Sequence, residues 1–152
     1  MATHPIIELK KKLITNKIIY FDSSDLLAKT SIKYNLYRVF RDPELTSSVL
    51  EYIQSFMEKK LVDVEFNTIL PLNNYSALPY ATDIAVSCNK SLLIQENGKF
   101  STTLNGDETV LLVIDTINSE SDKILINTIM KKLILFDVKI VGILIIFDQD
   151  IC

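Results

Sequence analysis

The chain has 152 residues, of which 48% are hydrophobic and 23% charged, and its formal net charge is −3. This length fits one domain, and this hydrophobic content excludes a largely disordered chain. The negative charge gives no general attraction to nucleic acid, and the longest apolar run, 140–147, is far below the roughly 20 residues of a membrane span. We therefore expect neither nucleic acid nor a membrane as a partner.

The cysteines, the histidine and the first residues indicate a cytoplasmic protein without histidine chemistry. Cys88 and Cys152 show no spacing typical of a metal site or a disulfide framework, which suits a reducing compartment. No signal peptide opens the chain, and its only histidine, His4, lies among the first polar residues. The frequent Ile, Lys and Asn fit AT-rich coding, as in some large DNA viruses or low-GC microbes, so a viral source is one interpretation.

The first part of the chain reads as a helical and extended cap over 1–41. Apolar residues at helical spacing beside a lysine face predict a helix over 5–16. Short apolar runs predict strands at 18–21 and 34–40, and the polar residues 30–31 predict a turn before the second strand.

The next helix has the clearest start signal in the sequence. Asp42 is a good N-cap and Pro43 suits the first helical position. Apolar residues at helical spacing then predict a helix that continues to about Lys60.

Strands and helices alternate through the rest of the chain. This alternation predicts an α/β fold with a mostly parallel sheet and helices on both faces, as a single domain over 1–152 whose core is 42–152. The expected elements are strands at 62–70, 91–95, 110–114 and 140–147, helices at 77–88 and 123–136, and a polar loop at 96–107.

Two acidic residues follow buried strands of this sheet. Asp115 ends the apolar run 110–114, and Asp148 ends the run 140–147. Because ligands bind at the carboxyl ends of parallel strands, these carboxylates could hold a ribose or a phosphate-bound Mg²⁺. The structural alternative is that they cap the next helices or face water, and the pattern alone leaves both open.

The loop after Asp115 has the position of a phosphate loop but the wrong charge. It offers Asn118, Ser119 and Ser121 together with two acids, Glu120 and Asp122. A carboxylate about 4 Å from a phosphate charge costs on the order of 4 kcal/mol at an effective dielectric near 20, against about 0.3–2 kcal/mol from the helix dipole. The simpler role is that Ser119 or Ser121 caps the helix that follows.

The order of the motifs resembles orotate phosphoribosyltransferase, a type I phosphoribosyltransferase of pyrimidine synthesis. The resemblance covers roughly residues 6–149. The segments that carry it are Tyr75-Ser76-Ala77-Leu78-Pro79-Tyr80-Ala81-Thr82, residues 92–94, residues 106–109, residues 143–148, and residues 34–38 followed by Arg41-Asp42-Pro43. It implies the family's fold, the substrate phosphoribosyl pyrophosphate with Mg²⁺, and a dimer with sites at the interface.

The departures from the family gather where it binds its substrate. The resemblance implies two ribose-binding acids at the end of strand 110–115, but Ile114 replaces the first and only Asp115 remains. The basic residues expected at 95–97 are Gln-Glu-Asn, and the mobile catalytic loop is reduced to 98–105 with Lys99 as its only cation.

Two further departures lie outside the phosphate contacts. The orotate signature falls near Leu27-Ala28, which do not match the family's serine and glycine. The chain also ends at Cys152, before the family's closing strand and helix, which would leave apolar surface open.

These departures predict a catalytically inactive phosphoribosyltransferase-like protein, a pseudoenzyme that acts as an interaction or scaffold protein. We expect self-association as the resemblance implies, no catalytic residue, no metal ligand, no cofactor and no binding of phosphoribosyl pyrophosphate. A remnant ligand site would comprise Tyr75, Ser76, Asp115, Thr116, Asn118, Ser119 and Ser121.

The alternative is a divergent active phosphoribosyltransferase of the orotate or pyrimidine class, or a nucleotide- or nucleobase-binding protein. It would use Asp115, Tyr75 and Ser119, and only the enzyme would require Mg²⁺.

Overall fold

The computed structural model describes residues 7–9, 11, 19–22, 31–34, 36–72, 76–117 and 120–147. The chain divides into two compact units, Met1–Ser55 and Phe56–Cys152, and the division falls within the residues of the helix α2 (Pro43–Lys60). The single domain over 1–152 with a cap that ends at 41 stays a prediction.

The first unit contains a short hairpin and a 3-10 helix. Its residues 7–9 and 11 are helical, within the helix predicted at 5–16. The strand β1 (Ile19–Asp22) pairs antiparallel with β2 (Ser31–Tyr34), so the strand predicted at 18–21 is confirmed within one residue.

The strand predicted at 34–40 is wrong, and so is the turn predicted at Ser31. Ser31 begins β2, and Leu36–Arg41 forms the 3-10 helix η1. A short apolar run such as this one fits a strand or a helical turn equally well by periodicity. The helical turn prevails, and its end is fixed by Asp42, whose N–H donates to the Val39 carbonyl at 3.2 Å.

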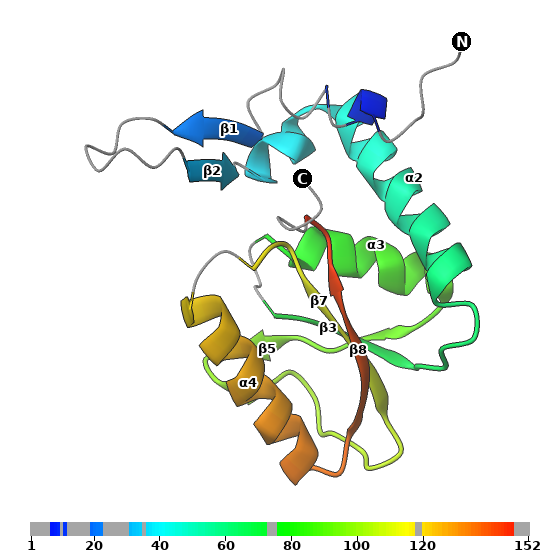
Figure 1. Cartoon of the computed structure of the whole chain (residues 1–152). Helices are drawn as coiled ribbons and strands as arrows, with labels where there is room; N and C mark the ends of the chain where they lie inside the picture. Colours follow the sequence, from blue (N-terminus) through cyan, green and yellow to red (C-terminus); the bar gives the residue numbers. More distant parts are fainter. Residues whose placement is uncertain are drawn as a thin grey trace. The chain divides into compact units, whose positions relative to one another are not determined.

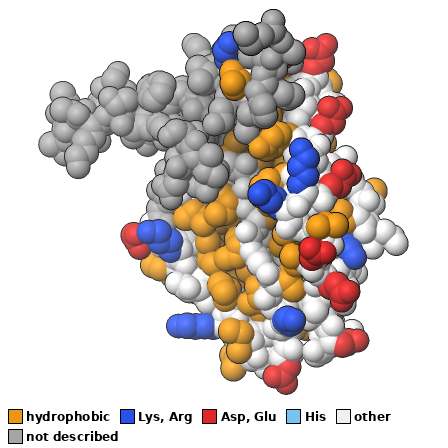
Figure 2. Space-filling view, turned by 45° about the vertical axis from the view of Figure 1, so that its right-hand side comes forward, with side chains coloured by type: hydrophobic (Ala, Val, Ile, Leu, Met, Phe, Trp, Pro, Cys, Tyr) orange, Lys and Arg blue, Asp and Glu red, His pale blue; other side chains and the backbone are white. Residues whose placement is uncertain are grey.

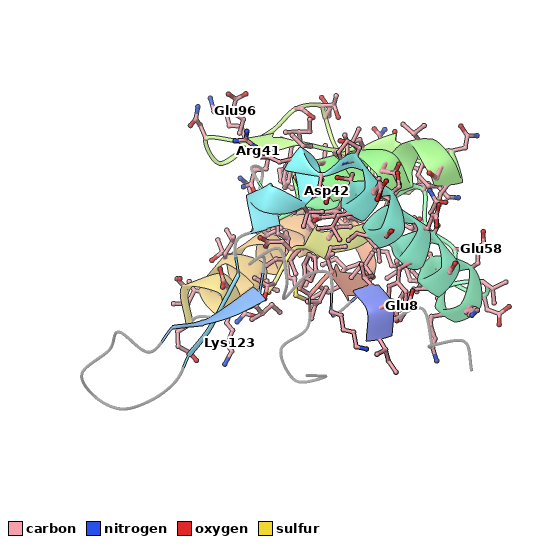
Figure 3. The ribbon with its side chains drawn as sticks, turned by 90° about the horizontal axis from the view of Figure 1, so that it is seen from above. Glu8, Arg41, Asp42, Glu58, Glu96 and Lys123 are labelled. Atoms are coloured by element: carbon pink, nitrogen blue, oxygen red, sulfur yellow. The ribbon has the colours of Figure 1, made fainter. Side chains whose placement is uncertain are left out.

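The helix α2 begins where the sequence predicts. Asp42 Oδ1 accepts hydrogen bonds from the N–H groups of Glu44 and Leu45, at 3.1 and 3.2 Å, and this is the N-cap arrangement. Figure 3 shows Asp42 at this end of the helix. The buried side chains of α2 recur every four residues: Leu45, Val49, Ile53 and Met57.

The second unit is built on a four-stranded parallel sheet with the order β4-β3-β7-β8. The helix α3 (Leu78–Cys88) packs against β3 and β4, and α4 (Glu120–Leu135) packs against β8 (Figure 1). The predicted α/β class with a mostly parallel sheet is confirmed. The strands are β3 (Thr68–Pro71), β4 (Ser91–Leu92), β7 (Thr109–Ile114) and β8 (Lys139–Ile145).

Both faces of the central strand β7 are buried, which explains its unbroken apolar sequence. One face belongs to a core shared with α4, formed by Val110, Leu112 and Ile114 with Ile126, Ile129 and Leu133. Because side chains alternate along a strand, Leu111 and Val113 face the other side of the sheet, and both are buried there as well.

Several boundaries differ from the prediction. The strand expected at 62–70 begins only at Thr68, where pairing with β7 starts. Asn67 fixes that point, because its N–H donates to the Thr109 carbonyl and its Oδ1 accepts from the Thr109 N–H, each at 3.0 Å. The strand expected at 91–95 pairs with the sheet only over Ser91–Leu92. None of the described helices is long and apolar enough to cross a membrane.

The polar loop predicted at 96–107 contains an unpredicted hairpin. Its strands are β5 (Gln95–Glu96) and β6 (Lys99–Phe100), joined by a two-residue turn. In this turn Asn97 has a φ of 50° and Gly98 a φ of 75°. Positive φ at both positions is typical of the Asn-Gly hairpin turn, so the sequence does carry the signal for it.

Candidate functional site

The candidate site lies at the carboxyl edge of the parallel sheet. At the end of β3 the Leu72 N–H donates to the Val113 carbonyl at 2.8 Å, and beyond β8 the Phe147 N–H donates to the Asp115 carbonyl at 2.8 Å. These bonds bring the segments that follow β3, β7 and β8 together at one edge. Ligands of open α/β sheets bind at such an edge.

Asp115 is the charged residue of this edge. Only 7% of its surface is exposed, and no cation lies within salt-bridge distance of it in the described part of the chain. Buried charges in proteins are normally paired, because leaving water without a partner is costly. Asp115 therefore has no salt-bridge partner among the described residues at the place where a ligand would lie.

Tyr80 and Phe147 form an aromatic pair beside Asp115. Tyr80 is fully buried on α3, and its ring centroid lies 6.2 Å from that of Phe147, with the rings nearly perpendicular at 73°. Burial, and secondly the negative charge of Asp115, raise the pKa of Tyr80 far above its ordinary value. The phenol therefore stays protonated at every physiological pH.

Two buried hydroxyl groups belong to the same edge. Ser76, just before α3, and Thr116, just after Asp115, are both buried. Within the described residues, neither Ser76 Oγ nor Thr116 Oγ1 has a hydrogen-bond partner. A buried hydroxyl without a partner costs about 1–3 kcal/mol, so a polar ligand that bonded to these two groups would gain free energy.

Only some of the predicted site residues lie together at the carboxyl edge of the sheet. Ser76, Asp115 and Thr116 lie at the carboxyl edge, and Ser121 lies on α4 with an exposed side chain. Tyr80 and Phe147 were not predicted as site residues. Ser76 and Tyr80 are four residues apart around the start of a helix, and this spacing was the available signal for Tyr80. The predicted residues outside the described ranges are Tyr75, Asn118, Ser119 and Asp148.

The N-terminus of α4 is acidic. The helix begins at Glu120, three residues earlier than predicted, and its first turn carries Glu120 and Asp122. Of the two caps predicted, Ser121 is wrong because it is already inside the helix, and Ser119 lies outside the described residues. The early start is favourable because acids stabilise the positive end of a helix dipole. Lys123 pairs with Glu120 at 3.0 Å on the exposed surface of α4 (Figure 3).

The β5–β6 hairpin is held on the far part of α4. Lys132 Nζ donates to the Gly98 carbonyl and lies 5.1 Å from the centroid of the Phe100 ring. Phe100 also makes an edge contact with Phe136, with the centroids 6.4 Å apart. Lys132 follows Glu120 by twelve residues, or about 18 Å along the helix axis. Lys99, on this hairpin, is exposed.

We expect Lys132→Ala to loosen the hairpin without unfolding the second unit. It removes a charged hydrogen bond and a cation–π contact, together worth about 1.5–3 kcal/mol. Hydrogen exchange at the Ser101 amide, which donates to the Ile94 carbonyl at 2.7 Å, should accelerate at least tenfold. Lys131→Ala, an exposed neighbour, is the control. Equal exchange rates in the two variants would show that Lys132 does not anchor the hairpin.

No family model matches the sequence, and no curated protein matches it either. Solved structures do match. The UMP synthase of Leishmania donovani aligns with a TM-score of 0.72 and 22% identity over 95% of this chain and 32% of that one. An orotate phosphoribosyltransferase from Aeropyrum pernix aligns with a TM-score of 0.65 and 18% identity, over 93% of this chain and 81% of that one. An adenine phosphoribosyltransferase from Saccharomyces cerevisiae aligns with a TM-score of 0.69 and 10% identity, over 95% of this chain and 90% of that one.

These similarities establish the fold. The chain has the fold of type I phosphoribosyltransferases, as its resemblance to the orotate enzymes predicts. It spans about a third of the length of the Leishmania UMP synthase. In the described residues, no group of three or more His, Cys, Asp or Glu lies close enough to hold a metal ion.

Proposed function

We propose that this chain is a phosphoribosyltransferase-like protein that has lost phosphoribosyl transfer and acts through protein–protein association, first with a second copy of itself. The observation that carries the proposal is the charge of the carboxyl edge. Asp115 is buried there with no salt-bridge partner among the described residues, and the first turn of α4 adds Asp122 and Glu120, the latter paired with Lys123.

The charge matters because phosphoribosyl pyrophosphate carries several negative charges. Its reaction needs cations or oriented N–H groups that stabilise the pyrophosphate as it leaves. A carboxylate about 4 Å from one phosphate charge opposes binding by on the order of 4 kcal/mol at an effective dielectric near 20. Two acids in the first turn of α4 exceed the benefit of the helix dipole, which is at most about 2 kcal/mol.

The region around Lys99 supports the same conclusion. Its hairpin contacts Lys132 in the last turn of α4 and Phe136, the residue after the helix, far along that helix from the acidic first turn. In this arrangement Lys99 does not compensate the acids of the first turn.

The association surface that we propose is the side of the second unit formed by β8 and α4. The outer edge of β8 has no hydrogen-bonded neighbour among the described strands, and unpaired edges readily add another strand. The exposed apolar residues of α4 are Ile124, Leu125, Ile134 and Leu135. Figure 2 shows that hydrophobic side chains are exposed among charged ones in the described part of the chain. Exposed apolar patches of this kind mark interaction sites.

A second copy is the occupant that fits this side best. An edge strand can pair with the same strand of another molecule across a two-fold axis, so one surface serves both partners. The exposed α4 residues would then be covered in the same contact.

We expect the chain to form a dimer that Leu135→Lys weakens at least tenfold. Leu135 is 84% exposed on α4, so the new charge is harmless in the monomer but would be buried in the contact. The control is Val86→Lys, a 78% exposed apolar residue on α3. Sedimentation velocity over a concentration series measures both. A wild-type chain that stays monomeric, or equal weakening by both variants, would contradict this surface.

The second candidate function is a divergent phosphoribosyltransferase of the orotate or pyrimidine class, or a nucleotide or nucleobase binder. The buried hydroxyls of Ser76 and Thr116 favour it, because they are available to a polar ligand. The test is an assay for pyrophosphate release from phosphoribosyl pyrophosphate with Mg²⁺ and orotate. We expect no release, and release that Asp115→Asn abolishes would support the second candidate.

A further inference from the structure

We infer that the carboxyl edge around Asp115 binds a small organic cation, a primary amine in its protonated form. The inference rests on the proposed function in one respect, namely that this edge no longer holds a phosphate-bearing substrate. It adds a ligand class that protein association alone does not require.

The carboxylate of Asp115 supplies the negative charge that would attract such a ligand. Only 7% of the surface of Asp115 is exposed, and no cation of the described residues pairs with it. A ligand that brings a positive charge would supply the missing partner in a partly desolvated place, where ion pairing is stronger than in water.

The second argument is the match between donors and acceptors. A primary ammonium group has three N–H donors and no acceptor. This edge offers three groups that can accept, the Asp115 carboxylate and the hydroxyls of Ser76 and Thr116, and those two hydroxyls are buried without a partner among the described residues.

The third argument is the aromatic pair. Phe147 is half-buried, its N–H donates to the Asp115 carbonyl, and its ring meets that of Tyr80 edge-on. Aromatic faces attract cations, and this attraction grows when the cation is desolvated. The Tyr80 phenol remains neutral because burial and Asp115 raise its pKa, so it adds no competing charge.

Other ligand classes fit less well. An anion would be repelled by Asp115 and by Glu120 and Asp122 in the first turn of α4. A neutral polyol would satisfy the hydroxyls but leave Asp115 without a counter-charge. A metal ion would need more ligands than the described residues bring together.

The test compares three probes of similar size, n-butylammonium chloride, n-butanol and sodium butyrate, titrated into ¹⁵N-labelled protein. We expect butylammonium to shift the amide signals of Thr116 and Phe147 in a saturable way. Butanol should bind at least tenfold more weakly, and butyrate should not bind. Equal affinities for butylammonium and butanol would overturn the inference.

Variants separate this edge from general attraction of cations to an acidic protein. Asp115→Asn keeps the shape but removes the charge, and should lower the affinity for butylammonium at least tenfold. Asp107→Asn, in an exposed loop, should bind like the wild type. Ser76→Ala is the second site variant, and should weaken binding severalfold even if Asp115→Asn fails to fold. Unchanged affinity in Asp115→Asn, or in Ser76→Ala where Asp115→Asn does not fold, would overturn the inference.

The outcomes also separate this inference from the proposed function. Tight binding of phosphoribosyl pyrophosphate with Mg²⁺ would overturn both. Failure of butylammonium and of phosphoribosyl pyrophosphate to bind would overturn the amine site alone.

Discussion

Replacing Tyr80 with alanine should lower the free energy of unfolding by about 3–5 kcal/mol, the range for a large aromatic side chain removed from a core. Tyr80 has no exposed surface, and its ring contacts Phe147 beside Asp115. Urea denaturation at pH 7.5 measures the change. Tyr80→Phe keeps the ring and removes only the hydroxyl, so it should cost far less. Similar losses in both variants would show that the hydroxyl, and not the packing of the ring, sets the stability at this position.

Tyr80→Phe should also change how stability depends on pH. The folded state raises the pKa of Tyr80 above its unfolded value of about 10, because burial and the charge of Asp115 disfavour the phenolate. Such a group contributes its full stability below the unfolded pKa and loses it as the pH rises above that value. The wild type should therefore lose more stability than Tyr80→Phe between pH 9 and 11. Parallel profiles would contradict the assigned burial of the phenol.

Leu112→Ala should destabilise the chain by about 2–5 kcal/mol. Leu112 has no exposed surface and belongs to the core between β7 and α4. Leu135→Ala makes the same chemical change at a position that is 84% exposed, and should stay within about 0.5 kcal/mol. Both are measured by urea denaturation at a concentration below that of association. Comparable losses would contradict the assigned core.

The sequence predicted well those elements whose signal is local and strong. An unbroken apolar run marked β7, because only a strand buried on both faces tolerates one. The Asp42-Pro43 pair marked the start of α2, because an N-cap acceptor and a fixed φ act at that point alone.

Other elements depend on contacts that no local pattern contains. The start of β3 is set by hydrogen bonds between Asn67 and Thr109, which are distant in sequence. The first residues of the predicted strand at 62–70 have no partner strand in the described sheet, so their apolar character did not make them a strand. The β5–β6 hairpin was predictable from Asn97-Gly98 and was missed because the surrounding residues are polar.

In the candidate site, too, some residues are predictable from the sequence and others join only through tertiary contacts. Asp115 follows from its place after a buried strand, and Ser76 and Thr116 follow from the resemblance to a known family. Phe147 joins the site through a hydrogen bond to the Asp115 carbonyl, a contact that exists only once β7 and β8 are paired. Tyr80 joins it through the packing of α3 on the sheet. Spacing in the sequence does not reveal the contact of Phe147, whereas the four-residue spacing from Ser76 was the available signal for Tyr80.

Loss of phosphate binding at the carboxyl edge is the central feature of the proposed function. Isothermal titration calorimetry with phosphoribosyl pyrophosphate and excess Mg²⁺ tests it directly, since it detects binding whether or not turnover follows. We predict no saturable heat up to millimolar ligand, because Glu120 and Asp122 place negative charge in the first turn of α4, where a phosphate would bind. Saturable binding with a micromolar dissociation constant would contradict the account.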